Sequence, residues 1–261
     1  MSGMTVTVVG CSGSVPGPAS ACSCYLLRAE HEGRAWHLAL DLGNGALGAL
    51  QRYVDLLALD AVVLSHLHAD HCIDLACLVV WRRHHPVHRP EGRLPVHAPV
   101  GAAERLARAY GVPGAEDVTD VYDVRDLAHE GTFRVGPFTL TSYRVAHPVE
   151  AYGFRVECDG AVLAYTGDTD SCPELLPLMK GADLVLADTA FVDGRDDDAP
   201  GIHLSGSRAA RAAVDAGGVQ RLVLTHVPPW NDPEVCRAQA AAVWPGVVEL
   251  ARPGDVYRLG P

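Results

Sequence analysis

The segment 65–71 holds the residues of this sequence that are best suited to chemistry. It places the imidazoles of His66, His68 and His71 and the carboxylate of Asp70 on one short connection. Imidazole nitrogens and carboxylate oxygens are common ligands of zinc and similar divalent cations. The alternative is a solvated loop that is rich in histidine by chance. Because burying four such groups without a cation would be costly, we interpret the segment as a metal site.

An apolar run precedes this segment, and similar runs recur along the chain. Each ends in a polar residue that can bind a metal or carry a proton; the four runs are 62–66, 163–168, 184–188 and 222–226. Short runs rich in valine and leucine predict buried strands. Groups placed just beyond the carboxyl ends of such strands converge on one edge of a sheet. We therefore expect a single edge to hold all four polar residues.

Helical patterns lie between these runs, and hairpin-like alternation of apolar and polar residues occurs elsewhere. The predicted helices cover residues 45–57, 72–81, 101–110, 173–180, 205–216 and 233–244, and the hairpin-like patterns cover 25–40, 133–145 and 152–163. This order predicts an α/β fold, an αββα sandwich in which helices flank two mixed β-sheets. No linker rich in proline, glycine and serine is long enough to divide the chain, so we expect one domain over residues 1–261.

Charge and composition exclude several classes of function. Lysine and arginine total 21 against 32 aspartate and glutamate residues, a formal net charge of −11. This balance disfavours long nucleic acid as a substrate, whereas bound cations would still admit a small anion. We see no export signal and no apolar run near the roughly 20 residues of a membrane span, which predicts a cytoplasmic protein. The eight cysteines have no repeated spacing, which favours buried thiols over disulfides.

The segment 66–71 spells HxHxDH, and in this it resembles the metallo-β-lactamase superfamily. In that superfamily the first two histidines bind one metal and the Asp-His pair binds a second. The resemblance extends over nearly the whole chain, from 10–14 and 41–43 to 224–226. It implies the metallo-β-lactamase fold and three further ligands: His147 for the first metal, Asp168 as a bridging carboxylate, and His226 for the second metal.

Within the superfamily the sequence is most similar to the ribonuclease Z branch, which has an additional histidine ahead of a helix that leads to the final ligand. His203, followed by the predicted helix 205–216, matches that histidine. The resemblance makes His203 the acid that protonates the leaving oxygen. Two features argue against tRNA processing. Ribonuclease Z carries a long tRNA-gripping arm between the third-ligand histidine and the bridging aspartate, whereas residues 152–164 form little more than a hairpin, and the acidic balance disfavours a large RNA.

Three segments look like a narrower group. Residues 10–17, 64–71 and 80–86 resemble the actinobacterial, mycobacterial-type 3′,5′-cyclic nucleotide phosphodiesterases of the atypical class II kind. This likeness implies cyclic AMP or cyclic GMP as substrate, although spacing by itself does not distinguish a cyclic nucleotide from another phosphodiester. The alternatives are another hydrolase with the same site, such as a sulfatase, a lactonase or a ribonuclease Z-like nuclease, and a sensor that keeps its metals without turnover.

The chemistry expected for a small phosphodiester follows from these groups. Two cations bridged by Asp168 would lower the pKa of a shared water, so that the bridging hydroxide attacks phosphorus while both cations stabilise the phosphoryl oxygens. Asp70 would orient this hydroxide, and His203 would protonate the departing 3′ oxygen. Asp188 ends a predicted strand and is a candidate to hold His203, although the ribonuclease Z pattern has glutamate there. Zinc is the default metal, with manganese and iron as alternatives.

The remaining candidates are given structural roles. The basic patch Arg82–His85, with His88, is expected to face water rather than to steer a phosphate. Trp230 would either stack on a base or pack in the core. Four other histidines are expected to be surface or packing residues: His31, His37, His97 and His129. The resemblance also implies a homodimer, because ribonuclease Z-like proteins commonly pair.

Overall fold

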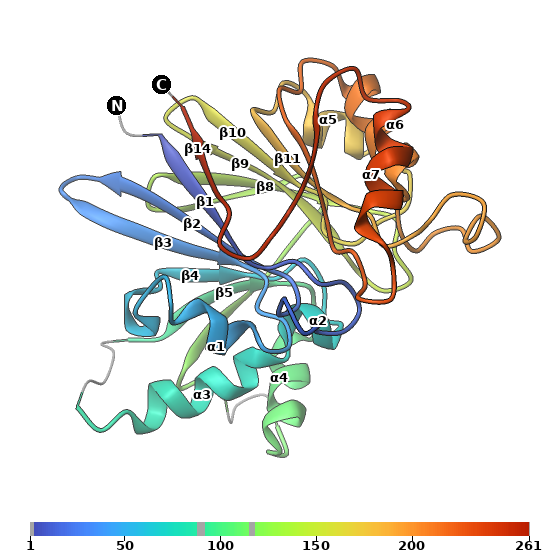
Figure 1. Ribbon diagram of the computed structural model, residues 1–261. Coiled ribbons are helices and arrows are strands. Elements are labelled where there is room, and N and C mark those ends of the chain that lie inside the picture. Colours follow the sequence, from blue (N-terminus) through green and yellow to red (C-terminus); the bar gives the residue numbers. More distant parts are fainter. Residues whose placement is uncertain (1–2, 88–91, 115–117, 261) are drawn as a thin grey trace.

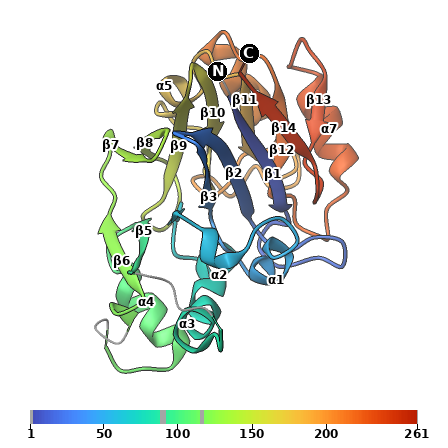
Figure 2. The same ribbon diagram turned by 90° about the vertical axis from the view of Figure 1, so that its left-hand side faces the viewer.

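The computed structural model of this protein describes residues 3–87, 92–114 and 118–260. Within these ranges two seven-stranded sheets face each other, and helices flank them on the outside (Figures 1 and 2). This arrangement confirms the predicted αββα sandwich. None of the described helices combines the length and the apolar composition that crossing a bilayer requires.

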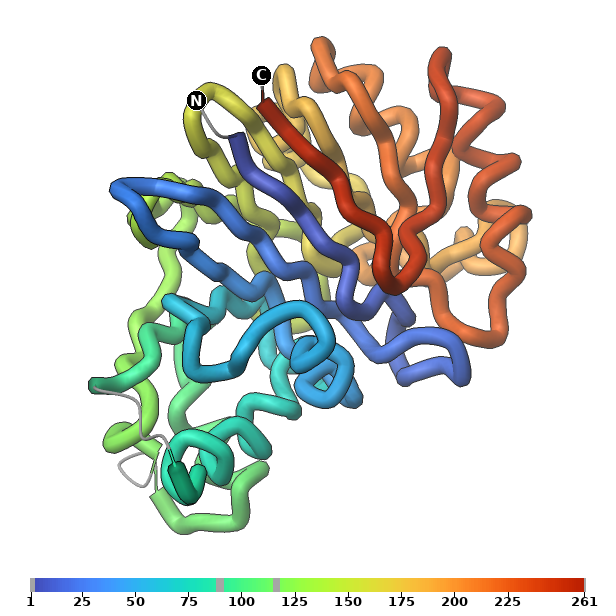
Figure 3. The backbone as a smooth tube through the Cα atoms, turned by 60° about the vertical axis from the view of Figure 1, so that its left-hand side comes forward, coloured from blue at the N-terminus to red at the C-terminus, as the bar shows by residue number. Residues whose placement is uncertain are grey.

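The first sheet has the strand order β14-β1-β2-β3-β4-β5-β6. Strands β14, β1, β2 and β3 pair antiparallel, whereas β3 to β6 pair parallel. The bounds are Met4–Gly10 (β1), Cys24–His31 (β2), Arg34–Leu40 (β3), Ala61–Val63 (β4), Leu94–Ala98 (β5), Tyr122–Asp126 (β6) and Val256–Leu259 (β14). Because β14 pairs with β1, the two ends of the chain lie side by side (Figure 3).

The second sheet repeats this plan, with the order β13-β12-β11-β10-β9-β8-β7. Strands β7 to β10 pair antiparallel and β10 to β13 pair parallel. The bounds are Gly131–Val135 (β7), Phe138–Arg144 (β8), Tyr152–Cys158 (β9), Ala161–Tyr165 (β10), Leu184–Asp188 (β11), Leu222–Thr225 (β12) and Val248–Leu250 (β13). Every residue of β11 is buried, as expected for a parallel strand covered on both faces.

Three apolar layers hold the sandwich together. The central layer lies between the sheets and includes Leu27 and Leu40 from the first sheet and Phe154 and Leu186 from the second. Fully burying one such side chain contributes roughly 1.5–3 kcal/mol. The two outer layers lie between each sheet and its helices. Each sheet is therefore apolar on the face toward the other sheet and on the face that its helices cover.

The helices divide between the two outer faces. Four accompany the first sheet: Ala46–Leu50 (α1), Ala69–Cys72 (α2), Asp74–His84 (α3) and Ala102–Tyr110 (α4). Three accompany the second: Leu175–Met179 (α5), Gly206–Ala216 (α6) and Pro233–Ala241 (α7). Helix α6 begins at the predicted place because the side chain of Ser205 accepts a hydrogen bond from the backbone N–H of Arg208.

Two of the predicted helices differ from the structure. The helix predicted over 45–57 is wrong beyond Leu50: the 3₁₀ turn Leu56–Ala58 (η1) follows, and Asp55 caps this turn by accepting from the N–H of Leu57. The helix predicted over 72–81 begins earlier, because α2 starts at Ala69 and α3 continues after Ile73. As a consequence, two of the predicted metal ligands lie in a helical turn rather than on a loop.

His97 packs between the sheets, as predicted for a packing residue. It is 5% exposed, and its ring stacks on Phe133 with centroids 3.9 Å apart. Burial, assisted by the charge of Arg125, lowers the pKa of His97 from 6.5 to about 4. Above pH 6.5 the ring is neutral in both the folded and the unfolded chain, so its titration has no effect on stability there. Between pH 6.5 and 4 only the unfolded chain binds the proton, which favours unfolding.

We therefore expect acidification to destabilise the protein through His97. From about pH 7.5 to about pH 5 this residue should account for about 2 kcal/mol of the loss in free energy of unfolding. In the His97→Phe variant, which keeps the stacked ring, that part of the loss should be missing. Urea unfolding of both proteins at the two pH values measures the difference, with His84→Phe as the control at an exposed histidine. The same pH dependence in both proteins would rule this account out.

Candidate metal centre

The parallel halves of the two sheets end at the same edge of the sandwich; most of the predicted ligands follow those ends, and His147 follows the antiparallel strand β8. His66 and His68 lie between β4 and α2, and Asp70 and His71 lie in α2. The other three follow strands of the second sheet: His147 after β8, Asp168 after β10 and His226 after β12. The runs expected at one edge of one sheet are thus divided between two sheets, and the packing of the sheets brings their ends together.

Three of the histidines form the first group. The Nε2 atom of His66 lies 3.0 Å from Nδ1 of His68, and the Nε2 atom of His147 lies 3.2 Å from the same Nδ1. The other nitrogen of His147, Nδ1, contacts the carbonyl oxygen of Ile202 at 2.9 Å. Nδ1 must therefore carry the hydrogen, which leaves a lone pair on Nε2. Nitrogens bound tetrahedrally at about 2.0–2.1 Å from zinc are separated by roughly 3.3 Å, so the group suits one cation.

Four residues form the second group: Asp70, His71, Asp168 and His226. The Nε2 atom of His71 lies 3.2 Å from Oδ1 of Asp168, and the Nε2 atom of His226 lies 3.1 Å from Oδ2. Three of these buried atoms make no hydrogen bond with the residues that the structure describes: His71 Nε2, His226 Nε2 and Asp168 Oδ1. Unpartnered buried polar atoms are costly. A cation between them would satisfy all three, so the residues fit a metal.

Asp168 lies between the two groups. Its Oδ2 atom is 3.1 Å from His226 Nε2 in the second group and 3.6 Å from His66 Nε2 in the first. The residue is 2% exposed. This position is the one that a carboxylate shared by two cations requires.

The electrostatics of the two groups also suit cations. Burial lowers the pKa of His66, His68 and His147, which keeps the rings in the neutral form that binds metal. In the second group burial opposes a charge on His71, but the carboxylates of Asp168 and Asp41 raise its pKa well above the ordinary value. A proton on His71 and a cation balance the same carboxylates, so metal binding there should release a proton.

Asp41 is a functional residue to which the sequence assigned no role. Its carboxylate is fully buried and accepts from the N–H and hydroxyl of Ser65 at 2.7 and 2.8 Å, from His71 Nδ1 at 2.8 Å and from the hydroxyl of Tyr165 at 2.6 Å. These contacts fix the orientation of His71 and point its Nε2 atom toward Asp168. The available signal was a carboxylate directly after the buried end of β3.

Replacing Asp41 with asparagine is expected to weaken the second metal group and the fold together. The amide keeps the shape but loses acceptors for three donors, at a cost of about 3 kcal/mol in free energy of unfolding. Loss of an outer partner of a metal-binding histidine typically weakens metal affinity about 10- to 100-fold. Competition with a chelating dye and urea unfolding measure the two effects. The control is Asp60→Asn, whose carboxylate accepts from Arg34 and from the N–H of His37 at the other end of β3. Unchanged zinc affinity in Asp41→Asn would contradict the assignment.

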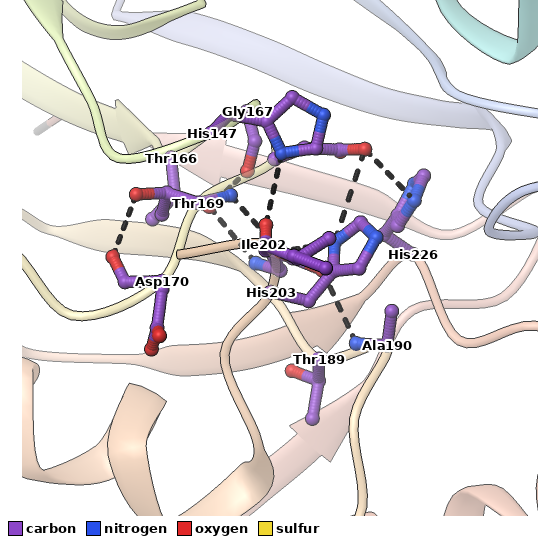
Figure 4. Close-up of polar contacts among 12 residues, drawn as sticks. His147, Thr166, Gly167, Thr169, Asp170, Thr189, Ala190, Ile202, His203 and His226 are labelled. Carbon is purple, nitrogen blue, oxygen red and sulfur yellow. Dashed lines mark hydrogen bonds and ion pairs between the residues drawn. The ribbon is translucent and has the colours of Figure 1, made fainter. Parts of the chain in front are cut away.

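His203 lies beside the second group and has the partner that the sequence suggested. Its Nδ1 atom is 2.9 Å from Oδ2 of Asp188 at the end of β11, and 4.0 Å from Oδ2 of Asp168. Figure 4 shows its ring close to those of His147 and His226. Burial by itself lowers the pKa of His203, but the carboxylate of Asp188 raises it to about 9. The ring therefore carries a proton at neutral pH and can donate it.

The structure assigns the remaining candidates to other places. Arg82 is buried and donates to the carbonyl oxygen of Gly92, and Arg83 forms an ion pair with Asp120. The basic patch thus has structural partners, while His88 lies outside the described residues. Trp230 is 62% exposed, so it does not pack in the core. All eight cysteines are free thiols.

The turn 10–17 has a packing role that the sequence did not show. The N–H of Gly13 donates to the carbonyl oxygen of Val227, directly after the ligand His226. A Cβ atom at Gly13 would lie 2.2 Å from the carbonyl oxygen of His226. Only glycine allows this approach, and the turn supports the backbone of the ligand.

Known proteins are similar to this chain in sequence and in fold. The family model for the beta-lactamase superfamily domain matches residues 40–227. An uncharacterised protein of Mycobacterium tuberculosis is 44% identical over 257 residues, which cover 97% of this chain and 92% of the relative. The probable metallo-hydrolase YhfI of Bacillus subtilis is 30% identical over 97% of this chain and 99% of its own. Ribonuclease Z of Mycobacterium bovis is 29% identical over 98% of each chain.

The solved structure of YhfI has a TM-score of 0.84 to this structure and covers 98% of this chain and 99% of that one. The likeness thus holds for the sequence and for the fold of two mixed sheets flanked by helices. The chain belongs to the beta-lactamase superfamily and has the metallo-β-lactamase fold.

Proposed function

We propose that this protein is a dinuclear metal-dependent phosphodiesterase that hydrolyses a small phosphodiester, with 3′,5′-cyclic AMP or cyclic GMP as the substrate class. The observation that carries the proposal is the position of His203. Its imidazole is held by Asp188 through Nδ1, and this atom lies 4.0 Å from the carboxylate of Asp168, which both groups of candidate metal ligands share. Hydrolysis of an unactivated diester is accelerated by a metal-activated water together with an acid for the leaving oxygen.

Each residue of the site has a role in this reaction. His66, His68 and His147 would hold one cation, and Asp70, His71 and His226 the second, with Asp168 shared. Bound cations, with zinc the first choice, would supply Lewis acidity to the phosphoryl oxygens and an acidified water. Asp70 is 9% exposed at the edge of its group, where its carboxylate would orient the attacking water. His203 would donate its Nε2 proton to the departing 3′ oxygen, because Nδ1 is engaged by Asp188.

The connection between His147 and Asp168 supports a small substrate. The structure describes all of residues 148–167, and they contain the hairpin of β9 and β10. Its turn is made by Asp159 and Gly160, both with positive φ, as a tight hairpin requires. No described part of this connection extends into an arm that could grip an RNA. The net charge of −11 opposes contact with many phosphates in the same way.

The proposed function also concerns the domain organisation and the oligomeric state of the protein. The apolar layer shared by both sheets supports treating residues 1–261 as one domain. We also expect a cytoplasmic homodimer, and light scattering coupled to gel filtration measures whether it forms.

The test is hydrolysis by purified protein reconstituted in turn with zinc, manganese and iron. The substrates are cyclic AMP, cyclic GMP, bis-p-nitrophenyl phosphate as a generic diester, and a tRNA precursor. Release of the 5′-nucleotide from a cyclic nucleotide is expected with at least one metal. If the protein cleaves the generic diester but neither cyclic nucleotide, cyclic nucleotides are ruled out as its substrates. Efficient cleavage of the tRNA precursor would indicate ribonuclease Z activity instead. If no diester is cleaved while metals are bound, the protein is not a phosphodiesterase.

A further inference from the structure

Besides Asp41 and Asp188, another buried carboxylate lies beside the site, outside the predicted set of ligands. Asp170 follows Asp168 by two residues and is 8% exposed. Its Oδ1 atom accepts from Nη1 of Arg208 at 2.8 Å and from the N–H of Ser171 at 2.7 Å. Its Oδ2 atom accepts from the N–H of Gly201 at 2.7 Å. The carboxylate therefore joins the strand end that carries Asp168 to the segment that carries His203.

That segment is held at three consecutive residues by three different groups. Asp170 holds the N–H of Gly201, and Nδ1 of His147 donates to the carbonyl oxygen of Ile202 at 2.9 Å. Nη1 of Arg208 lies 3.5 Å from the carbonyl oxygen of His203. Figure 4 shows the carbonyl oxygen of Ile202 facing the ring of His147. Asp170 thus contacts the segment directly at Gly201. It also contacts the segment indirectly at His203, through its ion pair with Arg208.

The loop 193–201 that precedes His203 is held in place by a few side chains of neighbouring elements. None of residues 193–201 is buried. Asn231 accepts from Arg195, and Gln239 pairs with the backbone of Asp193, in the first half of the loop. In the second half Arg208 forms an ion pair with Asp197 at 3.6 Å, and Asp170 accepts from the N–H of Gly201. A surface loop has many conformations of similar energy unless specific contacts select one. The side chain of His203 is fixed by Asp188. Its backbone is held on the following side by the N–H of Phe191, which donates to the carbonyl oxygen of Leu204, and on the preceding side by the contact of Asp170 with Gly201.

We propose that Asp170, paired with Arg208, is a positioning residue that sets the distance between His203 and the leaving oxygen. This inference rests on the proposed role of His203 as the acid. The carboxylate of Asp170 contacts the segment that carries His203 and the side chain of Arg208, so it would act through His203. A displacement of about 1 Å in a reacting group can reduce the rate about 100-fold.

The first test compares two substrates that differ in their need for an acid. The 3′ oxygen of cyclic AMP leaves as a poor leaving group and needs a proton, whereas p-nitrophenolate leaves without one. Asp170→Ala is expected to lower kcat for cyclic AMP about 10- to 100-fold and to change kcat for bis-p-nitrophenyl phosphate little. Asp170→Asn, whose amide oxygen still accepts from Gly201, should lie between. Equal losses on both substrates, or no loss, would overturn the proposal.

A double-mutant cycle separates positioning of His203 from a general effect. In the His203→Ala background, Asp170→Ala should cause no further loss of kcat for cyclic AMP, because the group it positions is gone. Multiplicative losses would show that Asp170 acts independently of His203. Zinc content should stay at the wild-type value in both Asp170 variants, since the ligands are retained.

Hydrogen exchange provides a readout that needs no substrate. In the zinc-loaded Asp170→Ala protein, amides of peptides spanning 199–204 should exchange faster than in the wild type, while those of β11 should not change. The matched control is Asp123→Ala, which removes another aspartate–arginine pair, with Arg125 at 2.7 Å, from the strand β6. Exchange that is unchanged at 199–204 would refute the proposal even if no diester proves to be a substrate, so its failure is distinguishable from that of the proposed function.

Discussion

Replacing Asp168 with alanine is expected to abolish hydrolysis of every phosphodiester that the protein cleaves. The side chain lies 3.2 Å from His71 Nε2, 3.1 Å from His226 Nε2 and 3.6 Å from His66 Nε2. It is the one carboxylate of the described site that faces both groups of ligands. Its loss should cost more than the roughly 10- to 100-fold typical of an outer-shell partner, because Asp168 would be a ligand of both cations and supplies one of the two carboxylates in the two groups.

Metal analysis separates this effect from unfolding. Burial favours the neutral form of Asp168, but His226, His71 and His66 hold its pKa well below the ordinary value. The carboxylate is thus charged in the folded protein and attracts cations. We expect Asp168→Ala to bind less than the wild-type amount of zinc after dialysis while its circular dichroism spectrum stays the same. Asp123→Ala is the control for a carboxylate on a distant strand. Normal zinc content together with normal turnover in Asp168→Ala would remove this residue from the ligand set.

The second large effect is expected for His203→Ala, and it should depend on the leaving group. Removing a general acid typically costs about 10²- to 10⁴-fold in rate. That loss should appear with cyclic AMP and cyclic GMP, whose 3′ oxygen must be protonated. It should nearly vanish with bis-p-nitrophenyl phosphate, because p-nitrophenolate needs no proton to leave. Zinc content should not change, since His203 belongs to neither of the two ligand groups described above.

Measurements of kcat for both substrates in the same zinc-loaded preparation test this expectation. His84→Ala, at an exposed position of α3, is the matched control. Asp188→Asn should show the same dependence on the leaving group with a smaller loss, because the ring stays but loses the carboxylate that keeps it protonated. A loss of equal size on both substrates would mean that His203 serves the attacking water or the metals instead.

The grouping of the candidate metal ligands was largely predictable because of where the sequence places them. His66, His68, Asp70 and His71 are neighbours on a single connection, so their proximity follows from the chain itself. His147, Asp168 and His226 lie far apart in sequence and were assigned through resemblance to a known family. The structure brings them to the same place. The sandwich of two sheets was predicted from the alternation of apolar runs, and it is confirmed.

The supporting residues were not predictable in the same way. Nothing in the sequence around Asp41 indicates that its carboxylate meets donors from Ser65, His71 and Tyr165. The role of Asp170 likewise depends on its hydrogen bonds with Gly201 and Arg208, which lie more than thirty residues away along the chain. Hydrogen-bond partners of this kind depend on how strands from separate sheets are placed, and local sequence does not encode that placement.

The sequence by itself determined the chemistry available to this protein: the types and spacing of the ligands, the apolar runs that end beside them, and the acidic balance that disfavours long nucleic acid. The tertiary structure decided how those groups cooperate. Because the parallel halves of two different sheets end at one edge, His66 from the first sheet and Asp168 from the second come within 3.6 Å of each other. Packing of the apolar layer between the sheets provides the free energy that holds these charged and polar groups together.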